Sequence, residues 1–108
     1  TQVNFELNQK MINLALQLLD LNKEDEVIDL FCGLGNFTLP ISRYVKTVVG
    51  IEGDSGLVER AKENARQNGV SNASFYKADL FEDVSGFEWF RGKKYSKALI
   101  DPARSGAI

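Results

Sequence analysis

The feature that most constrains the fold is an apolar run that leads directly into a glycine-rich turn. Residues 26–30, "EVIDL", have the character of a short buried strand, and "FCGLGNF" follows at once. Gly33 and Gly35 let the backbone turn sharply and let a ligand approach closely. Residues 36–39 then begin a helix, whose first N–H groups favour an anion. Such a turn is typical of nucleotide sites, but it also occurs as a plain connection between a strand and a helix.

Strands and helices alternate along the rest of the chain. Apolar spacing predicts one helix over 8–19, capped by Asn8, and another over 54–68 that stops at Gly69. A third helix is expected after the glycine turn, with Asn36 as its cap and Pro40 in its first turn. Strands are expected at 26–30, 46–51, 73–77 and 97–100, with an irregular stretch over 81–96. This alternation predicts an α/β fold, a parallel sheet of about four strands with flanking helices.

The unusual polar residues lie where the predicted strands end. They are the loop 29–36, Glu52, Asp79 and Asp101. Ligands of parallel α/β sheets bind outside the carboxyl ends of the strands. The sequence therefore predicts a binding site at this edge of the sheet.

Three of these positions restrict the chemistry of the ligand. Glu52 ends the second strand, where an acidic side chain accepts both ribose hydroxyls. Thr38 replaces the third glycine of the dinucleotide fingerprint, which a pyrophosphate requires. Asp29 would repel a pyrophosphate and attract an ammonium group. A ligand with a ribose, a cation and a carboxylate but no pyrophosphate is expected, and S-adenosylmethionine fits that description.

The third strand leads to Asp79, where the adenine edge is expected. Its carboxylate can accept from the exocyclic amine, with Phe31 and Leu80 as apolar walls. The alternative is that Asp79 only shapes a turn or caps a helix.

Four stretches carry a resemblance to a known family. "TQVNFELNQKM", "DLFCGLGNF", "GIE" and "IDPAR", in that order, resemble the RNA uracil-5-methyltransferases, above all the enzymes that methylate a uridine in 23S ribosomal RNA. The resemblance covers essentially the whole chain. It implies a class I (Rossmann-like) methyltransferase fold, S-adenosylmethionine as cofactor and an RNA substrate. A cytoplasmic location is expected because the chain opens without a signal-peptide pattern and its one cysteine cannot form an internal disulfide. It also implies cofactor contacts from Gln2, Phe31, Asn36, Glu52, Asp79 and Asp101, with Asp101 also next to the target base. Ala103 stands where many members have proline.

The family's chemistry implies that the chain is incomplete. A cysteine thiolate adds to C6 of uracil, the resulting enolate attacks the methyl group, and a base removes the C5 proton. In the family both groups follow the position of Ile108. Residues 1–108 are therefore expected to be the N-terminal, cofactor-binding half of the methyltransferase domain, inactive alone and without a catalytic residue. Cys32 is expected to pack in the cofactor loop. Members also carry a β-barrel RNA-binding domain, and some an iron–sulfur cluster.

Composition limits the other roles of the chain. The absence of histidine excludes a Ser-His or Cys-His dyad within it, and one cysteine cannot alone hold zinc or an iron–sulfur cluster. Because the net charge is −2, most of the contacts with an RNA backbone are expected to come from outside this chain. The cluster "RGKKYSK", residues 91–97, either touches RNA phosphates or is a solvated loop. Phe87, Trp89 and Phe90 either stack on a base or cover the sheet. No membrane contact is expected.

Alternatives from other classes stay open at this point. The first is a methyltransferase of another base specificity, although Arg104 stands where amino-group methyltransferases have an aromatic residue. The second is a nicotinamide-dependent oxidoreductase, which the missing third glycine disfavours. The third is a non-enzymatic interaction module. A fourth strand left as a sheet edge would also invite self-association.

Overall fold

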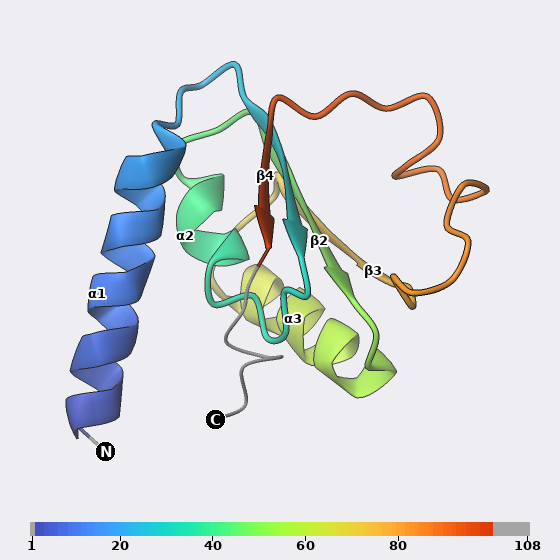
Figure 1. Ribbon diagram of the computed structural model, residues 1–108. Coiled ribbons are helices and arrows are strands. Elements are labelled where there is room, and N and C mark those ends of the chain that lie inside the picture. Colours follow the sequence, from blue (N-terminus) through green and yellow to red (C-terminus); the bar gives the residue numbers. More distant parts are fainter. Residues whose placement is uncertain (1, 101–108) are drawn as a thin grey trace.

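The predicted parallel sheet is confirmed in the computed structural model. The model describes the backbone of residues 2–100 and the side chains of residues 6–100. Its strands are β1 (Glu26–Leu30), β2 (Thr47–Glu52), β3 (Ala73–Lys77) and β4 (Lys97–Ile100). They pair in the order β3-β2-β1-β4, and every pairing is parallel. The carboxyl ends of all four strands therefore lie at one edge of the sheet (Figure 1).

Within residues 2–100, three helices accompany the sheet: α1 (Gln2–Leu19), α2 (Thr38–Ser42) and α3 (Ser55–Gln67). The helix predicted over 54–68 is α3, and the Asp54 carboxylate caps its start by accepting from the Leu57 N–H at 3.1 Å. Its end is followed by Gly69 with φ of +69°, a left-handed conformation that suits glycine.

Two predicted helix caps are wrong. Asn8 lies inside α1, which begins at Gln2, because asparagine costs a helix interior only a fraction of a kcal/mol, about 0.7 at most. Asn36 does not cap α2. That helix begins at Thr38 after Phe37, and no side chain caps it. Pro40 does lie in the first turn of α2, as expected.

The two faces of the sheet are covered differently, because alternate strand residues point to opposite faces. On one face, Val27 and Val48 pack with Ile12 of α1 and Ile41 of α2. On the same face, α3 packs on Phe75 of β3. The other face has no helix in the described chain. The long connection between β3 and β4 lies on that side (Figure 1). Its Trp89 packs on a cluster formed by Ile28, Val49, Ile51 and Ala78.

The glycine turn rests directly on the middle of the sheet. A Cβ at Gly50 of β2 would lie 2.9 Å from the Cys32 sulfur and 2.9 Å from a ring carbon of Phe75. Real Cβ contacts are not that short, so only glycine allows both neighbours. Cys32 is 1% exposed and packs with Phe75 and with Val58 and Ala61 of α3. Its surroundings are those of a small apolar core residue.

At the amino ends of the strands, one buried carboxylate joins the starts of β1 and β4. Asp25 accepts hydrogen bonds from the Asn22 N–H at 2.8 Å and the Ser96 hydroxyl at 2.8 Å, and pairs with the Lys97 ammonium at 2.9 Å. The Lys97 bond, followed by the Asn22 N–H, lowers the pKa of Asp25 below its ordinary value of 3.8.

This pair predicts a loss of stability in acid. A lowered folded-state pKa means that the unfolded chain takes up the proton first, so stability is present above pH 3.8 and falls as pH drops through the folded-state pKa. Urea unfolding at pH 7 and at pH 3 measures the loss. In Lys97→Met the difference between the two pH values should shrink. An equal difference in both proteins would contradict the assignment.

Candidate functional site

The predicted ligand edge contains a hollow of about 360 Å³ at the carboxyl ends of β1, β2 and β3. The residues that line it are Phe31, Glu52, Gly53, Ala78, Asp79, Leu80 and Phe81. The structure thus brings together Phe31, Glu52 and Asp79, which are far apart in the sequence. Leu80, expected as an apolar wall, also lines the hollow.

Glu52 links two of the loops that form the site. One carboxylate oxygen accepts from the Gly33 N–H at 3.0 Å, and the other accepts from the Asp54 N–H at 3.1 Å. The side chain is only 1% exposed. These two bonds fix the orientation of the Glu52 carboxylate, and a carboxylate offers about four acceptor positions in all.

An aromatic pair borders the hollow. Phe31 has φ of +60°, a strained conformation for a residue other than glycine, and it follows β1 directly. Its ring lies 6.2 Å from that of Phe81, measured between centroids, at an angle of 42°. Phe81 is 90% exposed and was missed by the sequence analysis, which treated it as the start of an irregular stretch. The available signal was an apolar residue two positions after Asp79.

Asp79 fits both of its sequence interpretations. One carboxylate oxygen accepts from the Phe81 N–H at 3.0 Å, which is the turn-forming contact. The side chain is exposed and lines the hollow. A ligand bond is compatible with the turn bond, because a carboxylate accepts more than one hydrogen.

Thr38, which replaces the third glycine of the dinucleotide fingerprint, makes a buried hydrogen bond. The Thr38 hydroxyl donates to the Asp29 carboxylate at 2.6 Å, and both side chains are fully buried. This bond holds the first residue of α2 to β1. A glycine at position 38 would remove it. Binding of Asp29 to a ligand ammonium group stays a prediction.

The other residues predicted to bind the cofactor do not line the hollow or are not fully described. Gly35 is buried with φ of +88°, and a Cβ there would lie 3.4 Å from the Phe75 ring. Asn36 is exposed before α2 and does not line the hollow. Gln2 is the first residue of α1, but its side chain is not described. Asp101 lies outside the described residues.

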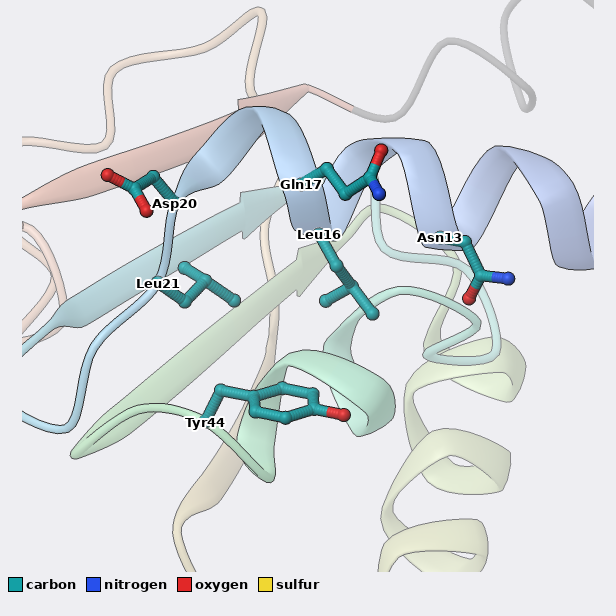
Figure 2. A pocket seen from close by; sticks show the side chains of 6 residues that line it. All are labelled: Asn13, Leu16, Gln17, Asp20, Leu21 and Tyr44. Carbon is teal, nitrogen blue, oxygen red and sulfur yellow. The ribbon is translucent and has the colours of Figure 1, made fainter.

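A larger hollow, of about 610 Å³, lies elsewhere (Figure 2). It is lined by Asn13, Leu16, Gln17, Asp20, Leu21 and Tyr44. It is bounded by the last turns of α1 and the segment before β2, away from the carboxyl ends where ligands of parallel sheets bind. Within residues 2–100, no group of His, Cys, Asp and Glu is arranged to hold a metal ion, and no helix is long and apolar enough to cross a membrane.

Comparison with known proteins identifies the family. The model of the family described as tRNA (Uracil-5-)-methyltransferase matches residues 1–107. The chain belongs to this family. The resemblance found in the four sequence stretches is therefore confirmed.

Similar family members are much longer than this chain. It is 70% identical over 107 residues to the 23S rRNA (uracil(1939)-C(5))-methyltransferase RlmD of Vesicomyosocius okutanii subsp. Calyptogena okutanii, covering 99% of the chain and 24% of that relative. It is 55% identical over 107 residues to the RlmD of Francisella tularensis subsp. novicida, again covering 99% and 24%. The chain thus spans about a quarter of the length of these relatives.

Solved structures confirm the predicted class I methyltransferase fold. An RNA methyltransferase from Salinibacter ruber in complex with S-adenosyl-L-homocysteine matches with a TM-score of 0.70 and 28% identity, over 84% of this chain and 56% of that one. The Pyrococcus abyssi tRNA (uracil-54, C5)-methyltransferase, in complex with the same compound, matches with a TM-score of 0.64 and 23% identity, over 86% and 22%.

The Thr38–Asp29 contact generates a test of how the glycine turn is held. Thr38→Val keeps the shape of the side chain but removes the donor to a buried carboxylate. It should lower the free energy of unfolding by about 1–3 kcal/mol, measured in urea. Thr38→Ser, which keeps the hydroxyl, is the matched control and should lose less. A Val variant as stable as the Ser variant would show that the bond contributes nothing.

Proposed function

We propose that this chain is the cofactor-binding half of the methyltransferase domain of a longer enzyme. That enzyme uses S-adenosylmethionine to methylate uracil C5 in RNA, with 23S ribosomal RNA as substrate. The observation that carries the proposal is the convergence of Phe31, Glu52 and Asp79 on one hollow, in a chain of this family. The names of the similar relatives support the choice of RNA.

Different residues of the hollow suit the ribose and the adenine of an adenosine. Glu52, buried and oriented by two backbone N–H groups, accepts from the ribose hydroxyls. Asp79, exposed at the end of β3, accepts from the exocyclic amine of adenine. Phe31 and Leu80 supply apolar contact to the base. Gly33 and Gly35 allow the backbone to approach the cofactor.

Three further contacts complete the proposed site. Gln2, Asn36 and Asp101 bind the cofactor as well, and Asp101 lies next to the target base. Their support is membership of the family together with the match of the four sequence stretches.

The chemical step needs groups from the rest of the enzyme. When bound, S-adenosylmethionine supplies the methyl group. Attack by uracil C5 requires a nucleophile to add at C6 and a base to remove the C5 proton. This chain has no histidine, and its one cysteine is 1% exposed in the core. We therefore assign both roles to parts of the polypeptide beyond this chain.

Contacts with other molecules follow from the same proposal. Ribosomal RNA as substrate implies action in the cytoplasm. In the basic cluster 91–97, Lys97 pairs with Asp25 and the Tyr95 hydroxyl donates to the Trp89 carbonyl. These two side chains hold the fold, so only Arg91, Lys93 and Lys94 are assigned to RNA phosphates.

Because β4 lies at one edge of the described sheet, the chain alone is also proposed to self-associate there.

The role of Glu52 can be tested in the full-length enzyme. Glu52→Ala removes a charge-assisted acceptor of the ribose hydroxyls and should weaken S-adenosylmethionine binding by about 1.5–3 kcal/mol, measured by calorimetry. Glu59→Ala, on the exposed surface of α3, is the control and should bind as the unmodified protein does. An unchanged dissociation constant in Glu52→Ala would contradict the assignment.

The packing role of Cys32 has a separate test. Cys32→Ala in the full-length enzyme should keep most of the methyl transfer and lose about 1–2 kcal/mol of stability. It should still form the covalent adduct with RNA that contains 5-fluorouracil, because fluorine at C5 cannot leave as a proton. The 108-residue chain alone should form no adduct. An adduct mapped to Cys32 would overturn the proposed mechanism.

A further inference from the structure

Phe81 is a large apolar side chain at the rim of the candidate cofactor hollow, and the fold itself buries almost none of it. It is 90% exposed, the highest exposed fraction among the large apolar residues that the structure describes. A single exposed apolar residue is unremarkable on an ordinary surface. This one lines a hollow that also contains the carboxylates of Glu52 and Asp79. Apolar groups beside a few convergent polar groups are typical of a ligand site.

The backbone of Phe81 is held although its side chain is exposed. The Phe81 N–H donates to the Asp79 carboxylate at 3.0 Å, and the Glu82 N–H donates to the Asp79 carbonyl at 3.0 Å. These two bonds close a turn just after β3. Exposed side chains change rotamer within nanoseconds. The ring of Phe81 can therefore move while the turn that carries it stays in place.

The other two apolar walls of the hollow are more firmly fixed. Leu80 packs against the cluster that contains Ile51 and Trp89. Phe31 is half-buried and follows β1 directly with φ of +60°, a conformation that persists only where the surrounding structure holds it. A planar ligand in the hollow would thus meet two fixed walls and one movable ring.

The rings of Phe31 and Phe81 leave no room for a base between them. Carbon atoms of stacked groups lie about 3.5 Å apart, so a base between two parallel rings needs a separation of about 7 Å. The ring centroids are 6.2 Å apart and the rings are tilted by 42°. A base that enters here must displace one ring, and Phe81 is the ring whose side chain is exposed.

We propose that Phe81 is a further adenine-binding residue, whose ring leaves Phe31 when the cofactor binds and then covers the solvent-facing side of the adenine. Aromatic side chains stack on nucleobases through the π-face that every base has. The Asp79 carboxylate would then accept from the adenine amine and also hold the Phe81 backbone, so one turn recognises both the edge and the face of the base. This inference rests on the proposed function, because it takes adenosine as the occupant of the hollow.

Replacement of the ring tests this role in the full-length enzyme. Phe81→Ala should raise the dissociation constant of S-adenosylmethionine about tenfold, because it removes one aromatic–base stack. Phe81→Trp, which keeps a flat ring, should bind nearly as tightly as the unmodified enzyme. Phe81→Leu, which is apolar but has no flat face, should stay closer to Phe81→Ala. Tyr44→Ala, at an exposed aromatic residue outside this hollow, is the matched control.

A labelling experiment reports on position 81 directly. In Phe81→Cys, saturating S-adenosylmethionine should slow the alkylation of the new thiol about tenfold, read by peptide mass spectrometry. In Glu59→Cys, on the exposed surface of α3, the cofactor should leave the labelling rate unchanged. Protection at position 81 alone would show that the cofactor covers this residue.

Two results would overturn the inference. One is equal cofactor binding by Phe81→Ala and Tyr44→Ala, and the other is equal labelling at position 81 with and without cofactor. Glu52→Ala separates this inference from the proposed function. If Glu52→Ala weakens binding and Phe81→Ala does not, only the role of Phe81 fails. If neither variant weakens binding, the proposed cofactor site fails as well.

Discussion

The site depends on the buried carboxylate of Glu52. Its two oxygens bind the Gly33 N–H in the loop after β1 and the Asp54 N–H in the loop after β2. A buried charge is costly unless it is hydrogen-bonded, so the two loops and the carboxylate stabilise one another's positions. The same side chain lines the hollow at the carboxyl ends of the strands. The side chain that we propose as acceptor of the ribose hydroxyls is therefore oriented by the protein itself.

Two further contacts fix the glycine turn on the sheet. The Thr38 hydroxyl bonds to the buried Asp29 carboxylate and holds α2 to β1. Gly50 lets the Cys32 sulfur and the Phe75 ring pack directly on the strand β2. With Glu52 at its rim, the turn is held on several sides, and a loop that is already ordered loses less entropy when a ligand binds.

Packing is uneven across the chain. The helices α2 and α3 bury apolar side chains against the sheet, and Trp89 covers part of its other face. In contrast, α1 buries Ile12 and leaves four large apolar residues exposed on its outer side. The carboxyl ends of β1, β2 and β3 thus have a well-packed base, while α1 exposes large apolar side chains on its outer side.

The sequence by itself determined the strands, the parallel sheet and the ligand edge, because these follow from local patterns. All four strands were found from short stretches of the sequence, and Glu52 and Asp79 stand at or just after strand ends in the sequence itself. Local patterns misplaced the start of α1 and the cap of α2, where weak propensities do not select one residue. Only the tertiary structure decided that Phe81 lies beside Phe31, that Thr38 binds Asp29, and which side of α1 stays exposed. Such contacts join residues from different elements, and the packing of those elements, which no local pattern encodes, sets their distances.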